Sequence, residues 1–109
     1  MAARTSSASF EGAEARWIDV QVQIAGGLPA FNIVGLADKA VAESRERVRA
    51  AFAAIGLALP SQRVIVNLAP ADRPKEGAHY DLPVAIGLMV AIGVLPPEAG
   101  QEYLAMGEL

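Results

Sequence analysis

The chain has 109 residues, of which 53% are hydrophobic and 19% charged, a composition that excludes a disordered segment and suits one folded domain. Its net charge of −3 gives no general attraction to nucleic acid or to an anionic membrane, and the lack of cysteine excludes disulfides, thiolate catalysis and cysteine-ligated zinc. No apolar core of a secretory signal lies near residues 1–12, so we expect a cytoplasmic protein.

The first 36 residues predict a small sheet. Residues 17–24 alternate apolar and polar side chains, which is typical of a strand with one buried face. Gly12 indicates a turn, so residues 4–11 are the expected hairpin partner of this strand. After "AGGLPA", the segment "FNIVGL" predicts a short buried strand over residues 31–36.

A helix is predicted from Asp38 to Ile55, where the apolar period changes. The residues expected on its buried face are Val41, Val48, Phe52 and Ile55. Glu43 and Arg47 have the spacing of an ion pair on the other face, and Gly56 is a plausible carboxy-terminal cap. After it, "RVIVNLA" at residues 63–69 is β-branched and apolar, which favours an interior strand.

The longest apolar run, residues 82–95, is shorter than the ~20 residues of a membrane span and predicts a core helix that ends near Gly93. Asp81 is expected to cap the free backbone amides at its start. Gly87 is expected to let this helix pack closely on the sheet. Residues 103–109, "YLAMGEL", predict the start of another strand.

The order of elements predicts an α/β fold, specifically an α+β two-layer sandwich with a mixed sheet and two helices on one face. Because the last predicted strand is cut off at Leu109, we expect residues 1–109 to be one domain of a longer protein. The unpaired edge at residues 103–109 would then favour dimerisation or aggregation of the chain.

The loop at residues 70–81 is the first candidate for chemistry. It holds no hydroxyl or thiol except the phenol of Tyr80, so a serine hydrolase centred on the loop is not expected. His79 is the only histidine and lies near Asp72, Glu76 and Asp81. A proton shuttle or a metal ligand usually needs several convergent donors, so a structural role for His79 is favoured.

Phosphate binding and nucleic-acid binding are the other candidates. The glycines of "GGLPAFNIVG" precede a strand rather than open a helix, which favours a hairpin turn over a nucleotide site. The arginines of "SRERVR" and the bases of the 70–81 loop are interleaved with acids, which favours a solvated face over a phosphate-tracking groove. The residues therefore assign no catalytic, cofactor or metal site. The candidates for contact with a partner or nucleic acid are Arg73, Lys75, Glu76 and His79.

Two long segments carry a family resemblance. They are "DVQVQIAGGLPAFNIVGLADKAVAESRERVRAAF" and "VIVNLAPADRPKEGAHYDLPVAIGLMVAIGVL". From about Phe10 to Leu109 the chain resembles the amino-terminal, ChlI-like domain of the magnesium-chelatase-like AAA+ ATPases known as YifB or ComM. Ala37 and Ala78 stand where this family often has proline, and Arg73-Pro74 replace a leucine and a basic residue. These differences change the stiffness of loops more than their chemistry.

The resemblance implies a fold like the second domain of ribosomal protein S5, shared with the Lon protease catalytic domain. The "PKEG" at Pro74 to Gly77 is similar to the segment before the Lon nucleophile, but the serine is missing. The lysine that Lon also uses would lie beyond Leu109. The resemblance therefore implies a non-catalytic accessory domain for assembly, substrate engagement or regulation. A Lon-like peptidase and a nucleic-acid-binding module are the alternatives.

For the longer protein, the resemblance implies an ATPase module after Leu109 that uses ATP and Mg²⁺. It also implies a cytoplasmic ring, expected to be a hexamer, so that the partners of this domain are its own AAA+ module and neighbouring subunits. Some family members are linked to DNA processing in natural transformation, which makes DNA a possible partner of the longer protein. No residue here is identified as binding a tetrapyrrole or a membrane.

Overall fold

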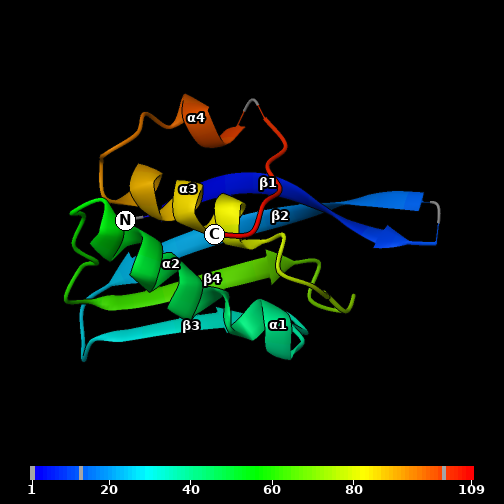
Figure 1. Cartoon of the computed structure of the whole chain (residues 1–109), viewed down its shortest axis with the longest axis horizontal. Helices are drawn as coiled ribbons and strands as arrows, with labels where there is room; N and C mark the ends of the chain where they lie inside the picture. Colours follow the sequence, from blue (N-terminus) through cyan, green and yellow to red (C-terminus); the bar gives the residue numbers. More distant parts are fainter. Residues whose placement is uncertain (1, 13, 102) are drawn as a thin grey trace.

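The computed structural model describes residues 2–12, 14–101 and 103–109, and its centre is a four-stranded sheet. The strands are β1 (Ala2–Glu11), β2 (Glu14–Ala25), β3 (Ala30–Val34) and β4 (Arg63–Ala69), in the order β1-β2-β4-β3. The pairs β1–β2 and β2–β4 are antiparallel, whereas β3 is parallel to β4. The predicted mixed sheet and the predicted hairpin at the start of the chain are thus confirmed (Figure 1).

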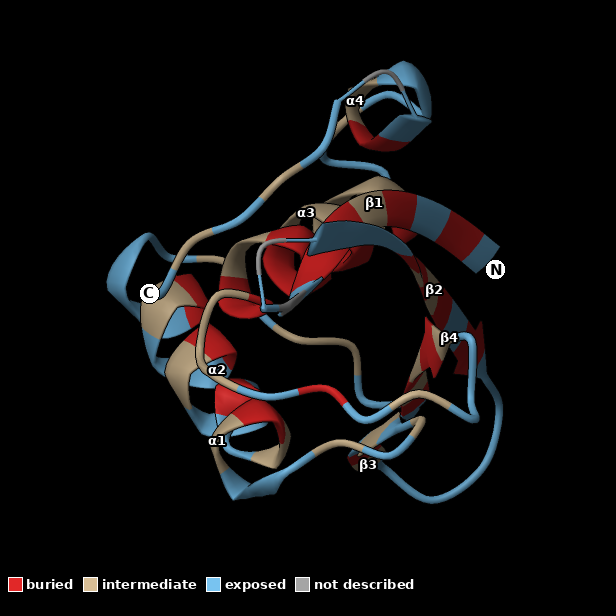
Figure 2. Ribbon diagram, turned by 90° about the vertical axis from the view of Figure 1, so that its right-hand side faces the viewer, coloured by how far each residue is buried: buried red, intermediate tan, exposed pale blue. Residues whose placement is uncertain are grey.

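The helices α1 (Lys39–Ala42), α2 (Ser44–Ala54) and α3 (Asp81–Ala91) lie together on one side of the sheet, as Figure 2 shows. The short helix α4 (Glu98–Gln101) packs against β1 and α3. This arrangement confirms the two-layer α/β class. The single helix predicted over residues 38–55 is divided at Glu43, because the Glu46 amide donates to the Glu43 carbonyl and tightens the chain into a turn there.

The core lies between the inner face of the sheet and the helices. Alternate residues of β2 are buried, as its period predicted, and alternate residues of β4 are buried as well. Helices α1 and α2 add Val41, Val48 and Phe52. Ile55 was expected to be buried with them, and that prediction is wrong. Helix α2 ends at Ala54, Ile55 caps it, and Gly56 follows with a φ of +77°, so Ile55 turns outward.

Gly87 has the packing role that the sequence predicted. A Cβ atom at this position would lie 2.7 Å from Cγ2 of Val22 on β2, closer than such atoms approach. Glycine therefore lets α3 sit directly on the sheet, and the helix ends at Ala91, close to Gly93 as expected. Within the described ranges, no helix combines the length and the apolar character required to cross a membrane.

The prediction of a strand at residues 103–109 is wrong. Only Leu104 forms an isolated parallel bridge, with Ser6 of β1. Residues 104–109, called here the C-terminal strap, cross the start of α3. The Gly107 amide donates to the His79 carbonyl at 2.8 Å, and the Leu82 amide donates to the Gly107 carbonyl at 2.9 Å. The strap thus covers part of the β1 edge and is not itself a free edge strand.

Candidate functional site at the β4–α3 loop

Residues 70–80 connect β4 to α3 and form a junction between segments far apart in the sequence. The Lys75 amide donates to the Leu36 carbonyl, and the Asp38 amide donates to the Lys75 carbonyl, both at 3.0 Å. These bonds join the loop to the β3–α1 connection. The carbonyl of His79, at the other end of the loop, accepts a hydrogen bond from the Gly107 amide of the strap.

Lys75 is buried, with 0% of its surface exposed, so the solvated position predicted for it is wrong. Its Nζ donates to the carbonyl oxygen of Gly35 at 2.7 Å and also to the carbonyl of Pro70. Burial lowers the pKa of this ammonium group, while the nearby Asp72 carboxylate opposes that change. The side chain therefore holds two backbone segments together and is not available to a partner.

Asp81 was predicted to cap α3, and this prediction is also wrong. Tyr80 occupies the cap position, and the Asp81 carboxylate points away from its own helix toward α2. It accepts from Arg47 Nε at 2.5 Å and Nη2 at 3.1 Å, from the Ser44 hydroxyl, and from the Leu109 amide at 3.1 Å. The carboxylate thus ties α2, α3 and the strap together, and its hydrogen bond raises the pKa of Arg47.

The main ion-pair partner of Arg47 is Asp81 and not Glu43, the residue four positions earlier that the sequence spacing predicted. The predicted pair with Glu43 exists, but its closest nitrogen–oxygen distance is 3.9 Å. The bidentate contact with Asp81 is shorter, and Nη2 of Arg47 also donates to the Ala40 carbonyl at 2.6 Å. The tertiary partner therefore sets the direction of the guanidinium group.

His79 lies half-buried at the entrance of α3. Its ring is tilted by 35° against that of Tyr80, with centroids 4.1 Å apart, and the ring of Phe10 in the hairpin lies 6.1 Å away. Nε2 is 2.7 Å from the Ala8 carbonyl oxygen. Because a carbonyl oxygen can only accept, Nε2 must carry the hydrogen in this contact. The imidazole thereby fastens the loop to β1.

A hollow of about 270 Å³ beside this ring brings together Ser9, Glu76 and His79. These are the residue types of a serine–histidine–acid triad, and sequence reasoning did not place Ser9 here. A triad requires the serine to donate to the imidazole. Nε2 instead donates to the Ala8 carbonyl, and the buried Ser9 hydroxyl has no hydrogen-bond partner among the described residues.

The phenol of Tyr80 lies close to Ser9 and is fully buried. It forms no hydrogen bond of normal geometry with a described residue. Burial, reinforced by the Asp38 charge, raises the pKa of Tyr80 to about 12, so the phenol is neutral at physiological pH. It contributes packing rather than proton transfer to this junction.

The four residues singled out as contact candidates do not form one exposed patch. Glu76 and His79 line the same hollow, Arg73 is half-exposed, and Lys75 is buried. Ser44 and Arg47, which meet Asp81, were missed as members of the junction. They lie 37 and 34 residues before Asp81, so no local pattern connects them with it.

Two features of the described residues bear on metal and phosphate binding. Across the described residues, no group of three or more histidine, cysteine, aspartate and glutamate side chains could hold a metal ion. The glycines of residues 26–27 lie in the β2–β3 turn, not before a helix, so they form no phosphate-binding loop.

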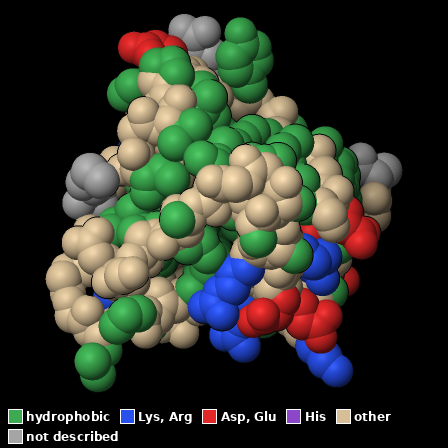
Figure 3. Space-filling view, turned by 60° about the vertical axis from the view of Figure 1, so that its left-hand side comes forward, with side chains coloured by type: hydrophobic (Ala, Val, Ile, Leu, Met, Phe, Trp, Pro, Cys, Tyr) green, Lys and Arg blue, Asp and Glu red, His purple; other side chains and the backbone are tan. Residues whose placement is uncertain are grey.

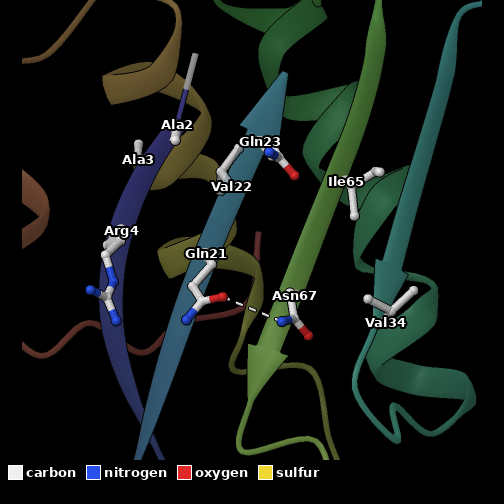
Figure 4. A pocket seen from close by; sticks show the side chains of 9 residues that line it. All are labelled: Ala2, Ala3, Arg4, Gln21, Val22, Gln23, Val34, Ile65 and Asn67. Carbon is white, nitrogen blue, oxygen red and sulfur yellow. Dashed lines mark hydrogen bonds between the residues drawn. The ribbon is translucent and has the colours of Figure 1, made fainter. Parts of the chain in front are cut away.

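A second hollow, of about 580 Å³, lies on the face of the sheet that the helices leave open (Figure 4). Arg4, Gln21, Val34, Ile65 and Asn67 are among the residues that line it. Three of its polar side chains have partners within the chain: Asn67 donates to the Gln21 carboxamide at 3.3 Å, and Arg4 forms an ion pair with Asp19.

A mixed sheet covered on one face by helices, with a lysine-pinned loop before the last long helix, defines a two-layer α/β domain. The chain belongs to the family described as Subunit ChlI of Mg-chelatase, whose match covers residues 20–109.

Curated relatives extend this match to nearly the whole chain. The uncharacterised protein YifB of Escherichia coli is 46% identical over 98 residues, which are 90% of this chain and 19% of that protein. The competence protein ComM of Haemophilus influenzae is 40% identical over the same share of each chain. An uncharacterised protein of Mycobacterium bovis is 37% identical over 106 residues, or 97% of this chain and 21% of that protein. The chain therefore spans about a fifth of the length of these relatives.

Proposed function

We propose that this chain is a non-catalytic accessory domain of a magnesium-chelatase-like ATPase, where it contributes to assembly, substrate engagement or regulation. The proposal depends on one observation about Lys75 and His79, the two side chains of the loop best suited to proton transfer. Lys75 and His79 both bind backbone carbonyls of neighbouring segments and so hold the fold together. Family membership and the much greater length of the relatives support a part within a larger protein.

The proposal assigns ATP and Mg²⁺ to a module outside these 109 residues and places the longer protein in a cytoplasmic ring, expected to be a hexamer. The partners of this domain would be that AAA+ module and the neighbouring subunits. One relative is named a competence protein, which supports the further proposal that the longer protein processes DNA in natural transformation.

The test compares the full-length protein with a version that lacks residues 1–109. We expect ATP turnover to persist while its stimulation by DNA, or the rate of unwinding, changes several-fold. A full-length variant with Asp81→Ala serves as the control for loss of this domain's packing alone. Equal turnover and equal unwinding by all three proteins would refute an accessory role.

A Lon-like peptidase is the second candidate, because Ser9, Glu76 and His79 share one hollow. Hydrolysis of a peptide by the purified chain, lost in both Ser9→Ala and His79→Ala, would replace the accessory role with this one. A nucleic-acid-binding module is a third candidate, weakened by the burial of Lys75. Titration with single-stranded and duplex DNA at two salt concentrations tests it, since phosphate contacts produce a steep salt dependence.

A further inference from the structure

Strand β3 provides an open edge of the sheet. It pairs with β4 alone, and Figures 1 and 4 show it as the outermost strand. The Ala30 amide donates to the Gln62 carbonyl, so the peptide groups of residue 30 face β4. Because these groups alternate along a strand, those of Phe31 and Ile33 point to the free edge. No described segment outside the sheet forms a backbone hydrogen bond with either residue.

Two arginines lie on opposite sides of this edge. Arg49 of α2 places its guanidinium 5.7 Å from the centre of the Phe31 ring, on the helix side. Arg63 pairs with Ala30 across the ladder and is exposed on the open side. Each lines a hollow next to the β2–β3 turn, of about 230 Å³ for Arg49 and about 380 Å³ for Arg63, and no acidic residue lines either hollow.

Arg49 and Arg63 differ from Lys39 and Arg45, cations of the helical layer that form ion pairs. Lys39 pairs with Glu43 at 3.9 Å, and Arg45 pairs with Glu46 at 3.5 Å. Figure 3 shows Lys, Arg, Asp and Glu side chains gathered together below a broad hydrophobic area. Within the described part of the chain, neither Arg49 nor Arg63 forms an ion pair. Their charge is therefore available to an external anion.

We propose that the free edge of β3 binds an extended acidic segment of a partner protein, which adds to the sheet as a fifth strand. The outward amides and carbonyls of Phe31 and Ile33 supply the main-chain hydrogen bonds. Successive side chains of an extended strand point to opposite faces, so two consecutive carboxylates reach Arg49 on one side and Arg63 on the other. Leu28, which is 86% exposed beside the Arg63 hollow, adds an apolar contact.

A second copy of this chain is a poorer occupant of the edge. The β3 sequence "AFNIV" contains no acid, and two such edges placed together would bring like-charged arginines toward each other. Nucleic acid is also less suitable. The single aromatic residue lining the two hollows is Phe31, which is buried and therefore offers no stacking surface for a base.

The test uses the 109-residue chain and a fluorescein-labelled peptide of about ten residues, a length that spans the edge with unpaired ends. The peptide has valine and threonine flanks and a central Glu-Glu, and a matched peptide has Gln-Gln. We expect saturable binding of the Glu-Glu peptide by fluorescence anisotropy, weakened at high salt, and weaker binding of the Gln-Gln peptide. Hydrogen exchange at the amides of Phe31 and Ile33 should slow when the peptide binds.

Arg49→Ala and Arg63→Ala should each weaken binding about two- to fivefold, as expected for the loss of one exposed ion pair. Arg16→Ala, in the distant hairpin, should leave binding unchanged. Absence of binding, equal binding of both peptides, or unchanged exchange at residues 31 and 33 would overturn the proposal. So would preferential binding of a single-stranded oligonucleotide, or dimerisation that blocks the peptide. Because the purified chain is used, these outcomes are independent of the ATPase test.

Discussion

Replacing Asp81 by alanine should destabilise the domain strongly, because one carboxylate connects three segments. The side chain is 0% exposed and accepts from Ser44, from two nitrogens of Arg47 and from the Leu109 amide. Removing one partner of a buried ion pair costs ~3–5 kcal/mol. Arg47 is 23% exposed and keeps its bond to the Ala40 carbonyl, so we expect the lower end, about 3 kcal/mol.

Urea unfolding followed by far-ultraviolet circular dichroism measures this change in the free energy of unfolding. The matched control is Glu14→Ala, which removes an ion pair with Arg16. Its nitrogen–oxygen distance is 3.1 Å, and the side chains of Arg16 and Glu14 are 43% and 73% exposed. It should cost less than about 0.5 kcal/mol. A double-mutant cycle of Asp81→Ala and Arg47→Ala should give a coupling energy of about 2 kcal/mol. A loss below about 1 kcal/mol for Asp81→Ala would refute the assigned role.

Three further substitutions test the packing around the junction. Gly87→Ala should cost about 1–3 kcal/mol in urea unfolding because its methyl group meets Val22, and adding Val22→Ala should recover part of that loss. The pKa of Tyr80 is about 12, above the ~10 of an unfolded chain, so the folded state loses about 2–3 kcal/mol of stability as pH rises from 10 to 12. Tyr80→Phe should flatten that decline, and an unchanged pH profile would contradict it. Lys75→Met should cost about 2–4 kcal/mol, because two backbone carbonyls lose their donor, and a neutral effect would show that water replaces it.

The sheet and the long helices were predictable because burial along them follows a local period. The alternation in residues 17–24 and the β-branched run at 63–69 match β2 and β4 within a few residues. Gly87 was also understood correctly, because a glycine inside an otherwise apolar helix has few other uses. Most of the errors concern residues whose partners are distant in the sequence, in the 70–80 loop and at the ends of elements.

Residues 103–109 illustrate the physical reason for such an error. The apolar residues Tyr103, Leu104 and Met106 suggested a strand, but an extended segment still requires a neighbour to pair with its backbone hydrogen-bonding groups. Here Ser6 accepts from Ala105, and His79 accepts from Gly107, so two different elements share the segment. The outcome depends on how β1 and α3 meet, which the local sequence does not encode.

Lys75 gives the "PKEG" segment a structural role in the loop. The loop turns from β4 back past the β3–α1 connection, and the Lys75 ammonium group donates there to the carbonyls of Gly35 and Pro70. A hydrogen bond from a charged donor contributes about 1.5–3 kcal/mol, so this side chain stabilises the turn even though its own burial is unfavourable. The hydrogen bonds of Lys75 therefore account for a charged side chain inside this loop by the way the loop folds.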